Sequence, residues 1–540
     1  MNTRLTIAAI VLLIAAGLSA GATQNKAKGG PAHKAPGKHP GVTAQPAAEG
    51  LTRRSGPLTE EEKAIAEVAW SYFAGPAYHK KSGFVDAVAG YPSTTMWDTA
   101  AYIAALMSAY ELGIIDRHEF DDRVVRFSAS MNRLDLFRNE LPNKAYNSET
   151  MEKVDYLNKP GEIGYSAIDL GRMLTWLRIL RDRYPEHANG IDHILLRWKF
   201  CHVIDERGQL FGAQIVDVPQ PVPAAATTPV QKPTPPPQPL KVVQYLQEGR
   251  LGYEEYAAKG FQLWGFRTEL ASRPDPFATV NIYGIDVPFD TRDPRTQVAH
   301  SYVVTESYVL DGIESGWDLI SDCTSSEETY SDTVAADFAS RIFRVQFARY
   351  CKTGVITARS EHQLDQSPYF VYDSIFSDGY PWNTITDKGA FRSEFAAVST
   401  KAALGMWALW DSPYTDILYR TVRDLNEPGK GFYEGLYENG NGPIRTFTAN
   451  TNGIILETLL FKVKGSLITK QRIDGIWEST IRDDFALNAE SCRPKCPRVA
   501  CTSSPICGTL GTDTMPASAL EPPCSARPPP CHPQSPCTAH

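Results

Sequence analysis

Glu306 stands out because it is a carboxylic acid in an otherwise apolar stretch, Val303–Tyr308. The surrounding segment, 301–312, has the pattern of a buried helix, since a helix without a polar face has to pack on all sides. Burial disfavours the charged form of a carboxyl group, and an acid that keeps its proton near neutral pH can protonate a leaving oxygen. Glu306 is therefore the candidate general acid. The alternative is a buried ion pair with an arginine.

Two aspartates have similar surroundings, Asp98 within Met96–Ala100 and Asp169 within Ala167–Arg172. Either carboxylate could serve as the base that activates a water molecule opposite a general acid. A structural role is the alternative for both. Asp169 in particular has the i,i+3 spacing to Arg172 that allows an ion pair on one helix face.

Polar and aromatic residues also gather at the starts of the apolar helices. Such a group of hydrogen-bonding side chains and flat rings is what a carbohydrate site needs. N-capping explains the hydroxyl residues but not the rings of Trp97, Tyr165, Trp264 and Tyr308. A Gly-bounded segment, 431–438, adds acids and aromatics that are typical of a binding rim. The candidate substrate-binding residues are Trp97, Tyr165, Trp264, Phe266, Tyr308, Trp382, Lys401, Glu434, Tyr437, Arg445, Asn450 and Asn452.

Two kinds of helix alternate along the chain and would position these residues. Amphipathic segments with a charged face are expected in an outer ring, at 59–73, 117–131, 186–200, 248–258, 332–350 and 414–425. Segments that are apolar nearly all round are expected in an inner ring, at 94–112, 164–180, 261–266, 301–312, 398–410 and 446–461. Six such hairpins around one axis make an all-α (α/α)6 toroid, in which the inner helix starts face one end. An irregular α-solenoid is the alternative, but the chain has no fixed sequence period.

The composition divides the 540 residues into one body and several segments that cannot pack. Residues 1–22 resemble a cleavable signal peptide, and an uncleaved membrane anchor is the alternative. Residues 23–57 predict a disordered linker, 58–465 the toroid, about 217–241 a Pro-rich surface insertion, and 466–540 an extension rich in Cys and Pro from 491. The signal peptide predicts a periplasmic or secreted protein with no membrane span after cleavage.

Several functions are disfavoured by what the sequence lacks. The net charge of −8 and the absence of a basic stripe argue against nucleic-acid binding. The chain has no Gly-x-Ser-x-Gly motif, no phosphate-binding Gly-rich loop with Lys-Ser/Thr and no His-Glu-x-x-His motif, so we expect no cofactor and no metal. Seven of the ten cysteines lie in the tail, where disulfides are possible but their connectivity cannot be read from sequence.

A resemblance to a known family adds to these expectations. It is carried by Trp97-Asp98, Gly164–Asp169, Thr305–Ser307, Ser399–Gly405 and Gly431–Gly435. At these motifs the chain resembles a bacterial family long catalogued as of unknown function, related to the glucoamylase-like domain and to (α/α)6 hydrolases of β-1,2-glucan. The resemblance covers about 58–465. It implies an inverting endo-hydrolase of an exported glucan in which Glu306 matches the acid, whereas the position of the base is left open.

Two other functions remain as alternatives at this point. A non-catalytic glycan-binding or scaffold protein of polysaccharide export would keep the aromatic rim without an acid and a base. A polysaccharide lyase on the same toroid would need basic residues against the carboxylates of its substrate. The inner helix starts offer few cations besides Lys401 and Arg445, so the sequence favours a hydrolase acting on an oligo- or polysaccharide.

Overall fold

The computed structural model describes residues 52–218, 240–266, 268, 270–274, 276–292, 301–317 and 334–468. The predicted signal peptide, most of the linker, the centre of the Pro-rich insertion and the tail beyond 468 lie outside these residues.

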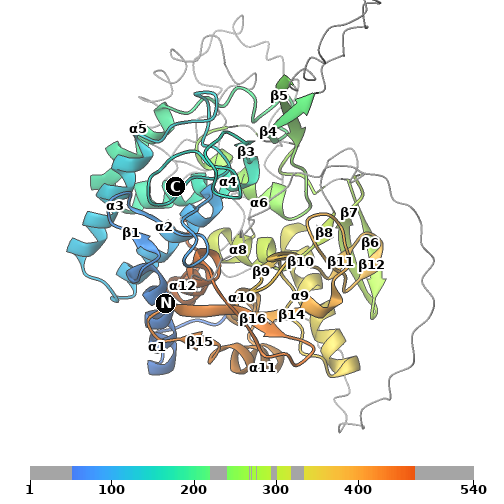
Figure 1. The fold of residues 1–540 in the computed structure, drawn as a ribbon. Helices are drawn as coiled ribbons and strands as arrows, with labels where there is room; N and C mark the ends of the chain where they lie inside the picture. The colour runs from blue at the N-terminus through green and yellow to red at the C-terminus, as the bar shows by residue number, and fades with distance from the viewer. Residues whose placement is uncertain are drawn as a thin grey trace, which may run out of the picture.

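Six helices form a closed inner ring (Figure 1). Each contacts the next along the chain, and the last contacts the first. Nearly every residue of these helices is buried, as expected for segments without a polar face. They are α2 (Met96–Glu111), α4 (Ala167–Arg183), α6 (Tyr253–Leu263), α8 (Glu306–Ser315), α10 (Thr400–Leu409) and α12 (Ala449–Lys464).

Five amphipathic helices lie outside this ring in the described part of the chain. They are α1 (Glu60–Ala74), α3 (Arg117–Met131), α5 (Ala188–Leu196), α9 (Val334–Thr353) and α11 (Pro413–Val422). Short 3-10 turns at Pro185–His187 and Ser393–Phe395 complete the helical elements. Each outer helix packs against an inner helix next to it in sequence, as α11 does against α10. The predicted toroid of helical hairpins is confirmed by this arrangement.

One expected hairpin is wrong. The outer helix predicted at 248–258 and the inner helix predicted at 261–266 are a single inner helix, α6. Its charged residues gave it an amphipathic pattern, but they are paired inside the protein rather than exposed. Glu254 forms an ion pair with Arg292, and Lys259 with Asp311. Charge pairing therefore allows a buried helix to carry a surface-like sequence.

The described residues also form six small sheets, so the prediction of an all-α protein is too narrow. Some strands lead into inner helices. Before α8 and α10 these strands contain Val303 and Val398, and β-branched residues favour extended backbone. Leading strands of this kind are β3, β8, β14 and β17. The strands are β1 (Tyr78–His79), β2 (Phe84–Val85), β3 (Gly164–Tyr165), β4 (Phe211–Val218), β5 (Leu240–Gln247), β6 (Phe277–Ile282), β7 (Ile285–Asp290), β8 (Tyr302–Val303), β9 (His362–Gln363), β10 (Phe370–Asp373), β11 (Phe376–Ser377), β12 (Tyr380–Pro381), β13 (Thr384–Ile385), β14 (Ala397–Ser399), β15 (Asn426–Glu427), β16 (Gly431–Tyr437) and β17 (Pro443–Phe447).

These strands pair in antiparallel fashion, some with a neighbour in sequence and others with a more distant strand, as β8 does with β11. The sheets have the orders β1-β2, β13-β10-β9, β12-β11-β8, β3-β4-β5, β6-β7 and β14-β16-β15, with β17 also on β16. In the longest pair, β4 and β5, Phe211 faces Gln247 and Val218 faces Leu240. Because β8, β14 and β17 each precede an inner helix, the sheets help to fix where those helices begin.

The helix starts are set by short polar side chains. Thr95, Ser166 and Thr448 each accept a hydrogen bond from a backbone N–H in the first turn of α2, α4 and α12. Such caps satisfy donors that have no partner inside the helix. They fix the first residues of three inner helices at the same end of the ring.

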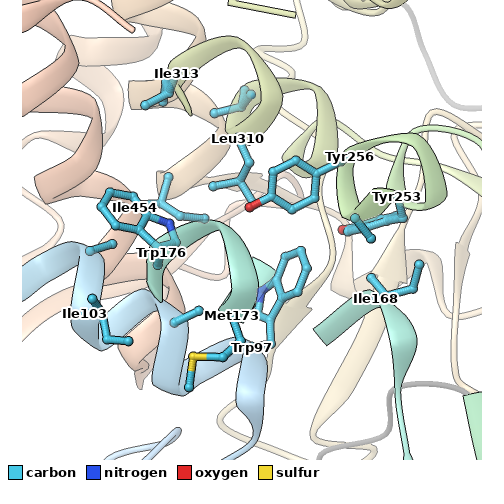
Figure 2. Packing of buried hydrophobic residues seen from close by; sticks show 14 of the residues in the cluster. Trp97, Ile103, Ile168, Met173, Trp176, Tyr253, Tyr256, Leu310, Ile313 and Ile454 are labelled. Carbon is cyan, nitrogen blue, oxygen red and sulfur yellow. The ribbon is translucent and has the colours of Figure 1, made fainter. Parts of the chain in front are cut away.

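The core lies along the axis of the ring. Figure 2 shows side chains from different inner helices meeting there, among them Trp97 from α2, Trp176 from α4, Tyr256 from α6, Leu310 from α8 and Ile454 from α12. All five are buried. No helix in the described ranges is long and apolar enough to cross a membrane.

Candidate active site

A pocket lies where α2, α10 and α12 begin. The space inside it, counting the part that is open to solvent, is about 450 Å³. Helix starts supply one part of its wall, and the loop after β2 and the strands β9, β10 and β16 supply the rest. Its lining residues are Ala87, Val88, Trp97, Asp98, Glu361, His362, Gln363, Phe370, Lys401, Glu434, Thr448 and Asn450. The prediction that inner helix starts share one concave site therefore holds for three of the six helices.

Trp97, Asn450 and Glu306 form a hydrogen-bonded triangle at this pocket. The indole Nε1 of Trp97 donates to Glu306 Oε1 at 3.2 Å and to Asn450 Oδ1 at 3.1 Å. The amide Nδ2 of Asn450 donates to the same Glu306 oxygen at 2.7 Å. The other oxygen of Glu306 forms an ion pair with Lys401. Residues from α2, α8, α10 and α12 are thereby joined at one end of the axis.

Glu306 is buried, as predicted, but its surroundings differ from those expected. It is the first residue of α8, because β8 ends at Val303 and Thr305 is the N-cap of the helix. Its side chain is 0% exposed, and it is not among the residues that line the pocket. The alternative of a buried ion pair is correct in kind, although the partner is Lys401 rather than an arginine.

Asp98 lines the pocket from the first turn of α2. Its Oδ2 accepts a hydrogen bond of 2.7 Å from the hydroxyl of Thr95, the helix cap. Burial raises the pKa of Asp98 to about 6, while the Thr95 hydrogen bond and the positive charges of Arg172 and Lys401 lower it. A carboxyl group with this pKa is ionised above about pH 6 and is suited to accept a proton from water.

Glu361 is a pocket carboxyl that the sequence analysis missed. It lies just before β9, in a stretch between α9 and α10 where no helix pattern drew attention to it. Burial and the negative charge of Glu306 together raise its pKa to about 7, against the opposing effects of Lys401 and Arg250. The run Arg359-Ser360-Glu361-His362-Gln363, five polar residues in succession, was the signal available in the sequence.

His362 and Phe370 complete this wall of the pocket. His362 is buried, and burial lowers its pKa to about 4, so the imidazole is neutral near pH 7. Its Nδ1 lies 3.1 Å from the carbonyl oxygen of Ser360. Phe370 on β10 pairs with Gln363 on β9 and supplies an aromatic ring.

Glu434 lines the pocket as predicted, but its carboxylate is already well bonded. Its Oε1 accepts from the hydroxyls of Thr448 at 2.5 Å and Thr451 at 2.6 Å, and its Oε2 from the backbone N–H of Gln363 at 3.1 Å. These bonds tie β16, β9 and the start of α12 together. Glu434 therefore fixes the shape of the pocket, whatever else it contacts.

Asp169 lies outside the lining of the pocket. Its Oδ1 accepts a 3.0 Å hydrogen bond from Ser166, and burial together with the charge of Glu248 raises its pKa to about 7. The alternative of an ion pair between Asp169 and Arg172 is wrong. Arg172 instead donates to Glu457 at 2.8 Å and to Asn450 at 2.7 Å, because its side chain reaches toward α12.

Four predicted aromatic contacts belong to the core instead. Trp264 and Phe266 follow α6, at the end opposite its first residue, so they cannot reach a site built from helix starts. Trp264 donates to the carbonyl of Leu174 at 2.8 Å. Tyr165 belongs to β3 and packs on Phe137, and Tyr308 lies against Gly252. All four are buried and none lines the pocket.

The remaining predicted contacts also lie outside the lining. Trp382 stacks on Tyr283, and the hydroxyl of Tyr437 donates to Asp365 at 3.1 Å. Arg445 is exposed and donates to Tyr433, whereas Asn452 accepts from the backbone N–H of Phe432 at 2.7 Å and holds β16 against α12. Lys401 and Asn450, by contrast, line the pocket as predicted.

One group in the described ranges has the donor atoms of a metal site, and it is remote from the pocket. Asp121, Glu186 and His187 lie close together near the surface. Arg117 forms ion pairs with both carboxylates, so its guanidinium group already supplies the positive charge that a metal ion would bring.

The ring of inner helices with hairpin partners defines the class of fold, and solved structures share it. A putative glucoamylase from Bacteroides caccae has a TM-score of 0.50 at 12% identity, covering 79% of this chain and 95% of that chain. A putative glucoamylase from Bacteroides fragilis has a TM-score of 0.50 at 11% identity, with 79% and 94% covered. An endo-β-1,2-glucanase from Chitinophaga pinensis, in complex with sophorotriose and glucose, has a TM-score of 0.49 at 13% identity, with 76% and 94% covered. The glucoamylase-like toroid is thus the fold of this protein.

The family follows from the sequence itself. Residues 64–465 match DUF3131, a family described as proteins of unknown function, and the chain belongs to it. No curated protein matches the chain. The resemblance stated from the motifs, to a family of unknown function with glucoamylase-like relatives in structure, is confirmed.

Proposed function

We propose that the protein hydrolyses O-glycosidic bonds of an oligo- or polysaccharide in this pocket. The observation that carries the proposal is a pair of buried carboxyl groups, Asp98 and Glu361, in the lining of one pocket. Burial raises the pKa of Asp98 to about 6 and that of Glu361 to about 7. Catalysis by a glycosidase requires one carboxyl group that keeps its proton and one that has lost it, and two carboxyls with different pKa values meet this requirement.

In this proposal Glu361 is the general acid and Asp98 is the base. The group with the higher pKa keeps its proton when the other has lost it, so between about pH 6 and 7 the protonation states suit both roles. Glu306 is the rival for the acid, as the sequence predicted. Its contacts with Trp97, Asn450 and Lys401 are all with hydrogen-bond donors, which supports a role for Glu306 as an acceptor that holds them.

The chemistry of the pocket supports a neutral glycan as substrate. Three carboxyl side chains line it, Asp98, Glu361 and Glu434, whereas the one lysine in the lining, Lys401, is paired with Glu306. A uronic acid polymer would bring its own carboxylates against these acids, which costs free energy. This disfavours a lyase. We propose a β-1,2-glucan as the substrate, because the sequence motifs resemble those of (α/α)6 hydrolases of that glucan.

An inverting, endo-acting mechanism belongs to the same proposal. An inverting glycosidase leaves about 6.5–9.5 Å between its two carboxyl groups for the attacking water, and a retaining one about 5–5.5 Å. The anomeric form of the first product, read by NMR within minutes of mixing, would distinguish the two.

Export through the N-terminal signal peptide is proposed as well. Cys201 is disulfide-bonded, and disulfides persist mainly in oxidising compartments outside the cytoplasm. N-terminal sequencing of the mature protein would test cleavage near Ala22. Recovery of intact Met1 would contradict it.

The decisive experiment is a screen of the purified protein against neutral glucans and one uronic acid polymer, reading reducing ends and unsaturated products together. We expect reducing ends from a neutral glucan, and loss of about 10²–10⁴-fold of the rate in Glu361→Gln. Glu255→Gln is the matched control, because burial raises the pKa of Glu255 to about 8 and the residue lies outside the pocket lining. Glu306→Gln tests the rival acid.

Each outcome has a distinct reading. Full loss in Glu306→Gln with turnover kept in Glu361→Gln would return the acid to Glu306. Unsaturated products would mean a lyase. A parent protein that binds glucan by calorimetry but cleaves none of the panel would be a glycan-binding protein, and the hydrolase proposal would fail.

A further inference from the structure

Arg172 is a buried cation that reaches from the middle of the inner ring to the pocket without lining it. It lies on α4 and is 0% exposed. One guanidinium nitrogen donates to Asn450 Oδ1 at 2.7 Å, and the other donates to Glu457 Oε1 at 2.8 Å. Its two partners are both on α12, and one of them, Asn450, is part of the pocket wall.

The contact with Arg172 determines which way the amide of Asn450 points. A guanidinium group can only donate hydrogen bonds, so the Asn450 atom that faces it has to be the oxygen. The amide nitrogen then faces Glu306 Oε1, at 2.7 Å. The indole Nε1 of Trp97 donates to the same oxygen at 3.1 Å, so Arg172 and Trp97 together hold the amide in this orientation, and loss of Arg172 would remove the shorter of the two bonds.

Arg172 also lies over the ring of a second pocket residue. Its guanidinium carbon is 4.7 Å from the centroid of the Trp97 indole, a cation–π distance. At its edge, the same ring is held through Nε1, which donates to Glu306 and Asn450. The indole is therefore held both at its face and at its edge.

A pair of carboxyl groups beneath Arg172 supplies its counter-charge. Glu314 accepts hydrogen bonds from Trp176 at 2.8 Å and from the hydroxyl of Tyr256 at 2.8 Å. Burial and the negative charge of Glu457 raise the pKa of Glu314 well above its usual range, which favours the protonated form of Glu314. Glu457 forms the ion pair with Arg172, so the buried cation has a negative partner.

We propose that Arg172 is a positioning residue of the pocket, which orients the Asn450 amide and the Trp97 ring for a bound glycan. This role rests on the proposed function of the pocket. The effect of the Arg172 charge on the pKa of a pocket residue can nevertheless be measured without turnover. Asp98 provides that measurement. Four neighbours on different elements act on it: Thr95 before α2, Arg172 on α4, Glu306 on α8 and Lys401 on α10.

The charge and the shape of Arg172 can be separated by two variants. Arg172→Lys keeps a positive charge but loses the planar fork, so it should leave the pKa of Asp98 near that of the parent while Asn450 and Trp97 lose their fixed orientation. The double variant R172M/E457Q removes the cation and its counter-ion together, which avoids an unpaired buried charge. Because Arg172 lowers the pKa of Asp98, the double variant should raise it.

Arg178→Lys is the matched control. Arg178 lies on the same helix, is also buried, and also lies over a tryptophan ring, at 5.4 Å from the centroid of Trp264. It donates to the carbonyl of Leu263 at 2.9 Å, remote from the pocket. A general effect of replacing a buried arginine on α4 would appear in this variant as well.

Two measurements test the proposal. The first is the pKa of Asp98 by ¹³C NMR of labelled aspartate carboxyls, assigned with Asp98→Asn. The second is binding and hydrolysis of sophorotriose and longer β-1,2-gluco-oligosaccharides. We expect Arg172→Lys to lower kcat/KM about 10- to 100-fold, the usual effect of losing a charge-assisted hydrogen bond, and Arg178→Lys to change it less than about 3-fold.

The outcomes separate this proposal from the proposed function. If the parent cleaves no glycan, the hydrolase proposal fails, yet a raised Asp98 pKa in the double variant and weaker sophorotriose binding in Arg172→Lys would still support positioning by Arg172. An unchanged Asp98 pKa in a folded double variant would overturn the proposal. So would equal effects of Arg172→Lys and Arg178→Lys on kcat/KM or on binding, or an absence of oligosaccharide binding by the parent.

Discussion

The starts of α2 and α4 are nearly identical in local structure and differ in what lies above them. In each, a hydroxyl residue caps the helix, accepts the N–H of an aspartate three residues later and donates to its carboxylate: Thr95 with Asp98, and Ser166 with Asp169. Burial raises the pKa of both aspartates. From the helix alone, the two would have the same function.

The difference lies in residues from distant parts of the chain. Glu248, which follows β5, accepts hydrogen bonds from the backbone N–H groups of Ala167 and Ile168 at 2.7 and 3.1 Å and so covers the start of α4. The start of α2 instead opens into the pocket, beside Glu361. The comparison teaches that a polar helix start in a toroid becomes a site only where the loops leave it uncovered.

The largest expected contrast is between the two aspartates themselves. Asp98→Asn should reduce turnover about 10²–10⁴-fold, since the amide cannot accept a proton from water. Asp169→Asn should change it less than about 3-fold, because Asp169 is outside the pocket lining. Steady-state rates on a cleaved glucan, with circular dichroism to confirm folding, would measure both. Equal losses would break the distinction between the two helix starts.

The packing that holds α4 in place gives the next largest effect. A Cβ added at Gly171 would lie 2.5 Å from backbone atoms of Ala257 on α6, closer than real contacts allow. Gly171→Ala should therefore lower the free energy of unfolding by about 1–3 kcal/mol. The control is Gly190→Ala on α5, where the nearest atom would be an ordinary 3.4 Å away. Denaturant unfolding of both variants would show whether α4 and α6 depend on this close approach.

The pH dependence of kcat/KM sharpens the comparison further. Activity should rise as Asp98 ionises near pH 6 and fall as Glu361 loses its proton near pH 7, which gives a narrow maximum between them. Asp169 also has a pKa of about 7, but Asp169→Asn should leave the profile unchanged. In Glu306→Gln both limbs should move to lower pH, because the charge of Glu306 raises both pKa values. A shifted limb in Asp169→Asn would contradict the assignment.

The smallest effect is expected from removing the charge that covers α4. Glu248→Gln keeps an oxygen for the helix N–H groups but loses the negative charge that raises the pKa of Asp169. The pKa of Asp169, followed by ¹³C NMR, should fall, while turnover should stay within about 3-fold of the parent. A large loss of turnover would mean that this region belongs to the active site after all.

The sequence predicted the inner helices well and their first residues less well. The apolar segments at 94–112 and 398–410 are α2 and α10, but Val303 before α8 and Val398 before α10 belong to strands. Glu306 therefore begins its helix. The pair 248–258 and 261–266 was misread because Glu254 and Lys259 are paired internally. Helical periodicity reports which faces are apolar, and it does not report whether a charge has found a buried partner.

By itself, the sequence determined the alternation of buried and amphipathic helices, the family, and the presence of Trp97, Asp98, Lys401, Glu434 and Asn450 at one site, because burial patterns and capping residues are local properties. Only the tertiary structure decided that Glu306 is paired with Lys401, that Arg172 belongs to Glu457 and Asn450, and that Glu361 faces Asp98's pocket. These facts join residues up to some 300 positions apart in the chain. The protonation state of a carboxyl depends on such neighbours through burial and charge, and no local pattern encodes them.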